Sequence, residues 1–391
     1  MNPSRRAWLA ALAAAAGAAT GGASRAARAQ QPAVAAPSSP SPSPSPSQQV
    51  RPRRLDFPRD HGAHPAFGVE WWYATGWLAD AGAGAQAGPA WGFQLTFFRS
   101  RTGLADTIDS RFAPRQLLFA HAALTDLSAR RLVHAERIVR WNGDENAPRG
   151  AATLRDTQVH IGDWRLQRDG GGIYRAALGD ETAGFEWRLS LGPTQPLLLQ
   201  GDAGTSRKGP HPDNASHYYS QPQLTVEGEL SRAGRARAAV RGRAWLDHEW
   251  SGSLMPERAV GWDWLGINLA DGAALMAFRL RDAQGAPVWA GGTLRTRDGT
   301  STTFGPGDVR FEPLQWWSSA ATRARYPVRW RVACPAGTYV LAALVEAQEL
   351  DGRATTGTVY WEGLSELLDE RGDRIGLGYL EMTGYAGALR L

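Results

Sequence analysis

Short runs in which apolar and polar residues alternate recur along most of the chain, and this pattern constrains the fold more than any other feature. In the clearest run, Trp91, Phe93, Leu95 and Phe97 fall on one face of a strand, because successive side chains of a strand point to opposite sides. Glycine-rich turns such as residues 168–172 separate these runs, as hairpins require. No long amphipathic helix pattern is present. The sequence therefore predicts an all-β protein.

The predicted strands form two sets of about seven or eight, a number typical of barrels and strongly curved sandwiches. The first set covers residues 70–78, 91–97, 116–124, 157–166, 185–191, 223–230 and 236–244. The second set covers residues 264–269, 274–281, 288–296, 328–333, 338–346, 358–364 and 376–382. We expect two antiparallel β-barrels or curved sandwiches packed together, an N-terminal domain over residues 54–243 and a C-terminal domain over residues 244–391.

The N-terminus has the parts of a bacterial export signal. Arg5 and Arg6 precede an alanine-rich stretch, and small residues stand before Gln30, which resembles a twin-arginine signal. We predict a signal over residues 1–29, a Ser/Pro-rich linker over 30–53 and a periplasmic or secreted protein. Without the four arginines of the signal, the net charge falls from +5 to +1.

The remaining charges, mostly arginines among acids, predict a solvated surface and no nucleic-acid partner. An apolar fraction of 43% is typical of globular proteins, and no transmembrane span is expected in the mature chain. Cys334 is the only cysteine, so no intramolecular disulfide forms, and we expect a buried, inert thiol. The oligomeric state does not follow from the sequence.

The block from Trp245 to Trp250 is the leading candidate for an active site. It places Asp247, His248 and Glu249 between tryptophans, and burying such groups costs several kcal/mol unless they pair or shift their pKa. The alternative is a turn in which Asp247 and Glu249 point at water.

Two further clusters combine aromatic and ionisable residues. One joins His61 and His64 to residues 70–73, and the other surrounds His217 and Tyr219. Alternation along a strand sets His217 and Tyr219 on one side, and likewise Trp245 and Asp247. We expect both pairs to line one interior.

Together, residues 60–65, 70–73 and 247–250 resemble the carotenoid 1,2-hydratase (hydroxyneurosporene synthase) family and its exported lipocalin-like, AttH-type relatives, from about residue 55 to the end. The resemblance implies two lipocalin-like barrels with a pocket at or near their junction. It implies that Asp247 is the proton donor to a terminal isoprenoid double bond, with Trp245, His217 and Tyr219 in its site. Trp245 replaces a Tyr and Tyr219 a Trp of the hydratases, which alters hydroxyl placement.

Hydration of an unactivated alkene needs a neutral acid, a stabilised carbocation and a placed water. A buried Asp247 would have a raised pKa and stay protonated. Trp245 and Tyr219 could stabilise the cation, while His217 or His248 could take the proton of the attacking water. The expected catalytic residues are therefore Asp247, His217, Trp245 and Tyr219. The residues expected to bind a lipophilic substrate are His248, Glu249, Trp250, Glu70, Trp72 and Trp264. No cofactor is expected.

Other uses of these residues stay open. His61 and His64 with the Asp247 block could bind a metal, although adjacent strand residues point oppositely and limit the ligand set; we predict none. A non-catalytic carrier of lipids or pigments needs the same pocket. Hydrolysis has weaker support, because Ser220 and Ser251 lie in no nucleophile elbow, and Glu70 with Asp247 could act as paired acids only if they lie close together.

Overall fold

The computed structural model describes residues 47–84, 88–103, 110, 113–253 and 255–389. Its described part is all-β, as predicted, with the short 3-10 helix η1 (Arg59–His61) as its one helix. The predicted export signal and most of the predicted linker lie outside the described residues. No helix of the described part is long and apolar enough to cross a membrane.

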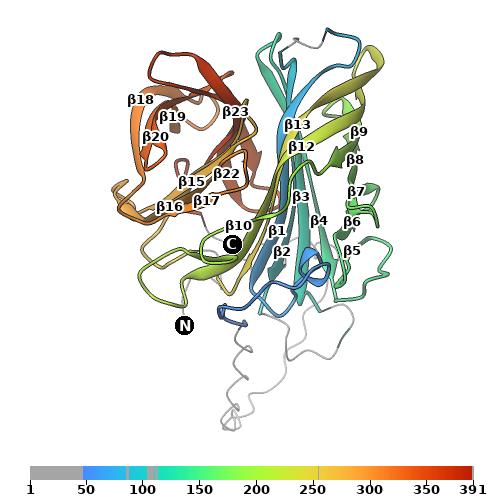
Figure 1. The fold of residues 1–391 in the computed structure, drawn as a ribbon. Helices are drawn as coiled ribbons and strands as arrows, with labels where there is room; N and C mark the ends of the chain where they lie inside the picture. Colours follow the sequence, from blue (N-terminus) through green and yellow to red (C-terminus); the bar gives the residue numbers. More distant parts are fainter. Residues whose placement is uncertain (1–46, 85–87, 104–109, 111–112, 254, 390–391) are drawn as a thin grey trace, which may run out of the picture. The chain divides into compact units, whose positions relative to one another are not determined.

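The first half of the chain forms the nearly closed antiparallel barrel that we call sheet A (Figure 1). Its strands follow the order β4-β3-β2-β1-β13-β12-β9-β8-β7-β6-β5, and β10 and β11 pair with β12. Their bounds are β1 Val69–Asp80, β2 Trp91–Arg101, β3 Gln116–Asp126, β4 Arg131–Trp141, β5 Gly150–Ala152, β6 Gln158–Ile161, β7 Trp164–Arg168, β8 Tyr174–Asp180, β9 Phe185–Gly192, β10 Leu198–Leu199, β11 Thr205–Arg207, β12 Ala215–Arg232 and β13 Arg235–Ser251.

The second half forms sheet B, in the order β17-β16-β15-β14-β23-β22-β20-β19-β18, with β21 paired to β22. Its strands are β14 Gly261–Leu269, β15 Ala274–Arg281, β16 Pro287–Arg295, β17 Ser301–Phe304, β18 Arg310–Ser318, β19 Arg325–Cys334, β20 Gly337–Ala343, β21 Glu349–Gly352, β22 Thr358–Leu368 and β23 Arg374–Met382. The two sheets confirm the predicted pair of lipocalin-like barrels.

Each sheet has its own apolar core, and a third apolar layer lies between the sheets. Phe93, Leu95 and Phe97 are fully buried in the core of sheet A, as their alternation predicts. The outer faces of both sheets contribute to the middle layer, where Tyr218 of β12 contacts Trp264 of β14. Because alternate residues of β12 and β13 enter these two layers, one hairpin contributes side chains to two separate interiors.

The strand β12 contains a bulge between Gln221 and Leu224, where three steps along β12 match two along β13. Pro222 lies in this bulge and has no N–H for the ladder, and Gln223 has a φ of +57°. The side chain of Gln223 donates to the backbone oxygens of Leu269 and Ala273 in sheet B. The bulge therefore fixes sheet A to sheet B and inverts the alternation along β12.

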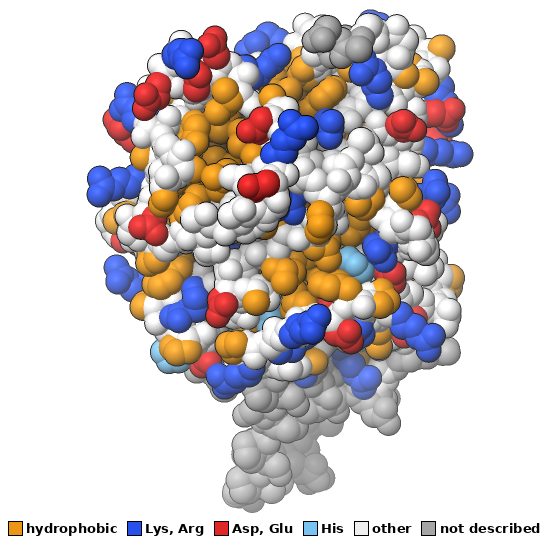
Figure 2. Space-filling view, viewed as in Figure 1, with side chains coloured by type: hydrophobic (Ala, Val, Ile, Leu, Met, Phe, Trp, Pro, Cys, Tyr) orange, Lys and Arg blue, Asp and Glu red, His pale blue; other side chains and the backbone are white. Residues whose placement is uncertain are grey.

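Most predicted strands coincide with observed ones, although some observed strands, such as β4 and β18, lie outside the predicted runs, and other differences occur at turns. The run predicted over residues 157–166 is divided into β6 and β7 by Gly162, whose φ is +61°. The predicted division between residues 243 and 244 lies within β13, and the connection between the sheets follows Ser251 and ends at Gly261. Basic and acidic side chains are interspersed on the face in Figure 2.

Candidate active site between the two sheets

The Asp247 block does not form a turn. It is the last part of β13, and alternation along this strand sends Asp247 and Glu249 toward sheet B while His248 and Trp250 enter the barrel of sheet A. Asp247 is only 3% exposed and Glu249 5%. The alternative in which these two carboxyl groups point at water is therefore wrong.

Asp247 faces a pocket between the sheets in which the space open to the centre of a water molecule is about 110 Å³. Apolar and aromatic side chains dominate its walls, as in most small-molecule sites. The lining residues from sheet A and its loops are Trp71, Tyr73, Thr96, Phe98, His121, Lys208, Tyr218, Asp247 and Glu249. Those from sheet B and the C-terminal segment are Trp262, Trp264, Phe278, Leu280, Thr356, Thr358, Tyr360, Glu362, Glu381, Thr383 and Leu389.

The Asp247 carboxyl group is held by three donors. Ser220 and the Trp245 indole donate to Oδ1 over 2.5 and 2.7 Å, and the Tyr218 hydroxyl donates to Oδ2 over 2.8 Å. Trp264 of sheet B in turn donates to the Tyr218 oxygen. Burial raises the pKa of Asp247 to about 7, although the donors favour the ionised form. Asp247 can therefore hold or release a proton near neutral pH.

Lys208, the only lysine of the chain, lies beside the second acid of this wall. Its ammonium nitrogen is 2.9 Å from Glu249 and lies over the rings of Tyr218 and Phe278. Lys208 therefore compensates Glu249 and leaves Asp247 without a paired cation among the described side chains.

Sheet B supplies two more carboxyl groups to the pocket. Glu362 of β22 and Glu381 of β23 are direct cross-strand partners, and both line the pocket opposite the β13 wall. Burial and the charge of Glu381 raise the pKa of Glu362 well above its usual value. Burial and the nearby Asp247 and Glu249 raise the pKa of Glu381 to about 7.

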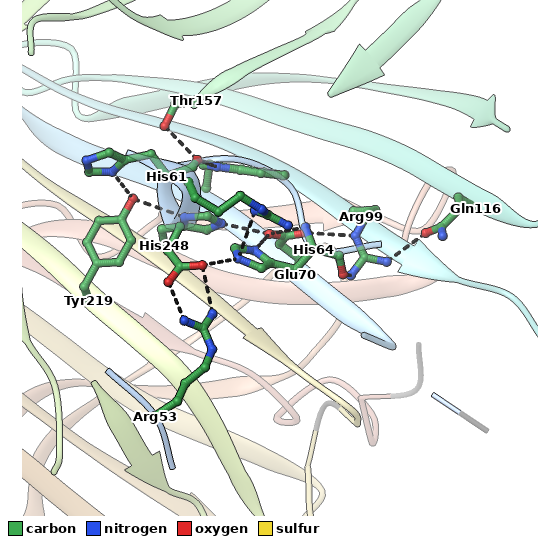
Figure 3. Close-up of polar contacts among 12 residues, drawn as sticks. Arg53, His61, His64, Glu70, Arg99, Gln116, Thr157, Tyr219 and His248 are labelled. Carbon is green, nitrogen blue, oxygen red and sulfur yellow. Dashed lines mark hydrogen bonds and ion pairs between the residues drawn. The ribbon is translucent and has the colours of Figure 1, made fainter. Parts of the chain in front are cut away.

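The other face of β13 belongs to a different cluster, the barrel network centred on Glu70 (Figure 3). His64 Nδ1, His248 Nε2 and Arg99 Nε lie 2.7, 2.9 and 2.8 Å from the Glu70 carboxylate. Burial alone would raise the pKa of Glu70, but His64, His248 and Arg99 hold it well below its usual value. Glu70 is therefore a buried, ionised and fully paired carboxylate.

Further contacts extend this network at both ends. His61 Nδ1 donates to the Tyr219 hydroxyl, which donates to His248 Nδ1, and this order leaves His248 Nε2 to donate to Glu70. At the other end, His64 Nε2 donates to Asp60, which Arg53 contacts through two nitrogens. Each side chain labelled in Figure 3 forms a hydrogen bond or an ion pair with another group of the protein.

His64, Glu70 and His248 have the spacing of a metal site, with one possible ligand atom from each within 4.8 Å of the others. The chemistry of the donors does not fit an ion, because both imidazoles direct N–H groups at Glu70 and the Arg99 guanidinium occupies its other oxygen. A cation there would have to displace two protons and lie beside a fixed positive charge. The triad is better explained as a structural network.

The structure divides the predicted site residues into two groups. Asp247, Trp245, Glu249 and Trp264 lie at the pocket, where Trp245 acts through its hydrogen bond to Asp247. The other group belongs to the barrel side and does not line the pocket: His217, Tyr219, His248, Trp250, Glu70 and Trp72.

The expected common interior for His217, Tyr219 and Asp247 is not present, because Tyr219 is paired with His248 across the strands and Ser220 with Asp247. The residues that sequence reasoning missed are Tyr218, Ser220, Lys208, Glu362 and Glu381. Pro222 was a usable signal for the first two, because a proline inside a strand pattern marks a bulge. Glu362 and Glu381 gave a weaker signal, as isolated acids in otherwise apolar runs.

Comparison with known proteins shows the family and the fold of this chain. A sequence model described as AttH-like matches residues 48–385. A crystal structure of an AttH protein from Nitrosomonas europaea is 42% identical, with a TM-score of 0.78 over 86% of this chain and 99% of that one. Among curated proteins, none matches the sequence.

Two more distant solved structures share the fold. Kievitone hydratase from Nectria haematococca is 15% identical, with a TM-score of 0.63 over 88% of this chain and 98% of that one. The protein CghA, solved with Sch210972, is 13% identical, with a TM-score of 0.53 over 87% of this chain and 95% of that one.

Proposed function

We propose, from the premise that this chain belongs to the AttH-like family, that it is a hydro-lyase that adds water to a carbon–carbon double bond of an isoprenoid or other lipophilic substrate. One observation carries the proposal. Asp247 is enclosed by indoles and hydroxyls, faces an apolar pocket and has a pKa raised to about 7. A carboxylic acid held neutral beside an apolar cavity is the group that alkene protonation requires.

The proposed reaction begins with proton transfer from Asp247 to one alkene carbon. The π electrons form the new C–H bond, and the adjacent carbon becomes a carbocation. A water oxygen then bonds to that carbon, and one O–H bond of the water breaks as its proton passes to a basic group of the pocket, so that an alcohol remains. Ser220, Tyr218 and Trp245 stabilise the carboxylate left on Asp247, because all three already donate to it.

The walls of the pocket suit the charge that develops. Aromatic faces attract cations, and Trp71, Trp262, Trp264 and Phe278 line the space beside Asp247. The fold shared with kievitone hydratase supports the reaction class.

A carrier that only binds its ligand is the alternative, and Asp247 separates the two functions. We would incubate the protein with monoterpene- and sesquiterpene-sized acyclic alkenes in isotopically labelled water and follow water addition by mass spectrometry. Asp247→Asn should lower turnover by about 10²- to 10⁴-fold while ligand binding persists. The matched control is Asp213→Asn, a partly exposed carboxyl outside the pocket, which should keep full turnover.

Equal ligand retention by wild type and Asp247→Asn, with no water-added product from either, would instead establish a carrier. A hydrolase would release two fragments rather than one product heavier by water.

We also propose twin-arginine export to the periplasm or beyond, on the strength of Arg5, Arg6 and the alanine-rich stretch that follows. Replacing both arginines by lysine should retain the precursor in the cytoplasm. Cell fractionation with N-terminal sequencing of the exported form measures this, and mature protein that begins before residue 20 would contradict the predicted cleavage.

A further inference from the structure

Two buried polar groups of the pocket, one from each sheet, lack a hydrogen bond of good geometry within the protein. Tyr73 Oη and Glu362 Oε1 are buried and line the pocket, and neither atom makes a hydrogen bond of good geometry among the residues that the structure describes, although the two side chains lie close enough to shift each other's pKa. Buried polar atoms are rarely left unpaired, so each such atom in a pocket points to a ligand or a water. Two atoms from different sheets converge here.

Glu381 completes this group. It opposes Glu362 across β22 and β23, and cross-strand side chains have Cβ atoms about 5 Å apart. Both side chains project from sheet B on the same side as Tyr360 and Tyr379, toward the β1 and β13 strands of sheet A. A water between these groups would have the two to four polar partners that a buried water needs.

We propose that Glu381 is the second proton-transfer group of the active site, which holds the attacking water opposite Asp247 and accepts its proton. Glu362 is then a positioning residue that keeps its own proton and helps to orient the water. This assignment rests on the proposed hydration reaction and goes beyond it, because it names the base and the side from which water attacks.

The proton balance closes with this assignment. Asp247 gives a proton to carbon, the water oxygen bonds to the neighbouring carbon, and the water O–H bond breaks with its proton going to the Glu381 carboxylate. The alkene has then gained one water, and one proton has moved from Asp247 to Glu381. Exchange with solvent through the pocket opening returns both groups to their starting states.

Among Asp247, Glu362 and Glu381, the electrostatics of the pocket favour a single ionised acid. Burial and the charge of Glu381 keep Glu362 protonated while Glu381 titrates near pH 7. Asp247 titrates in the same range, and ionisation of either group raises the pKa of the other. The titratable or charged groups that face Glu381 are Asp247, Glu249 and Tyr73 of sheet A, Lys208 beside Glu249, and Glu362, Tyr360 and Tyr379 of sheet B.

The test separates protonation of the alkene from addition of water. In deuterated water, reversible protonation by Asp247 places deuterium in the recovered alkene, whereas hydration yields the alcohol. Wild type should do both, and Asp247→Asn neither. Glu381→Gln should still exchange deuterium but form alcohol about 100-fold more slowly, and Glu381→Asp should recover part of that loss. Glu366→Gln, on β22 beside Arg374 and outside the pocket lining, should change neither rate.

Each outcome decides a different question. Alcohol formation by Glu381→Gln within a few-fold of wild type, or an equal loss of exchange and hydration, would overturn the assignment to Glu381. A wild-type protein that neither exchanges nor hydrates would end the proposed function, and this assignment with it.

Asp247→Asn provides a second measurement should Glu381→Gln fold poorly. The charge of Asp247 helps to raise the pKa of Glu381, so Glu381 should ionise at lower pH in this variant, as infrared titration of the carboxyl C=O band would show. An unchanged titration of the remaining pocket acid in Asp247→Asn would contradict the placement of Glu381 opposite Asp247.

Discussion

The two faces of the β12–β13 hairpin bury carboxyl groups equally well and leave them in opposite charge states. Glu70, in the barrel network, is 1% exposed and Asp247, in the pocket, 3%. Glu70 lies against the Arg99 guanidinium and two imidazoles, and its pKa stays well below the usual value. Asp247 has only neutral donors, and its pKa rises to about 7. The difference between these two acids comes from the positive charges beside Glu70, because both carboxyl groups are buried to a similar extent.

The same difference separates a structural role from a reactive one. The donors and acceptors of the barrel network form hydrogen bonds with one another. The network therefore stabilises the fold and offers no free donor or acceptor to a ligand. The pocket leaves Tyr73 Oη and Glu362 Oε1 without a hydrogen bond of good geometry among the described residues. Stability given up at such a site is the usual cost of a group poised to react.

Removing the cation from the barrel network should have the largest effect. Arg99→Met leaves Glu70 as a buried charge with its guanidinium partner gone, which should lower the free energy of unfolding by about 3–5 kcal/mol at neutral pH. Denaturant unfolding measures this. The deficit should shrink in acid, where Glu70 becomes protonated. Arg331→Met, in an exposed pair with Glu312, is the control and should change stability little. Equal losses in both variants would show that the network contributes no more than a surface pair.

Removing the acid from the pocket should raise the free energy of unfolding, whereas removing Arg99 should lower it. The pKa of Asp247 is raised from 3.8 to about 7 on folding, so the native state binds the proton more tightly and loses stability as pH rises through that window. Asp247→Asn should therefore gain stability over wild type between about pH 4 and 7, to about 2–4 kcal/mol above pH 7. Thermal unfolding across pH measures the gain. A constant difference at all pH values would mean that Asp247 is not held neutral.

Tyr219 and Ser220 are adjacent on β12 but lie on opposite faces, so substitutions at these two positions compare the barrel network with the pocket directly. Tyr219→Phe removes the hydroxyl that joins His61 to His248, and should cost about 1–2 kcal/mol of stability with turnover per folded molecule unchanged. Measuring both quantities on the same preparation separates the roles. A large loss of turnover with intact stability would instead assign Tyr219 to catalysis, as the hydratase resemblance implies.

Ser220→Ala should give the smallest effect, and one confined to the pocket. It removes one donor that favours ionised Asp247, so the pKa of Asp247 should rise by about one unit. Because the reaction needs the protonated acid, activity should persist to higher pH than in wild type. Infrared titration of the carboxyl C=O band follows the same shift without substrate. A downward shift would contradict the assigned hydrogen bond.

The sequence predicts the fold well because alternation is a local property. The buried side of β2 follows from Trp91 to Phe97 alone, and the identity of Asp247 as an enclosed acid follows from its tryptophan neighbours. The bounds of β15 match the predicted run at 274–281. Strands whose alternation is weak, such as β4 and β18, were not predicted.

The membership of the site could not be read in the same way. Leu224 and Val226 enter the barrel, and uninterrupted alternation from them would put Tyr219 on the outer face with Asp247. The bulge at Pro222 inverts the alternation, so Tyr219 enters the barrel and Ser220 joins Asp247. Glu362 and Glu381 come from a second sheet more than 100 residues away along the chain, and only tertiary packing brings them to the pocket.

The same bulge suggests how relatives could diversify. A single deletion near Pro222 would rotate the preceding segment of β12 by half a turn, exchanging the hydroxyl groups now beside Asp247 for an imidazole and a phenol from the barrel side. Such a deletion would change the side chains that line the pocket while the residues of the Asp247 motif stay the same. Proteins with this fold can therefore change their active-site residues through a one-residue insertion or deletion in β12. A comparison that considers only amino-acid substitutions would not detect such a change.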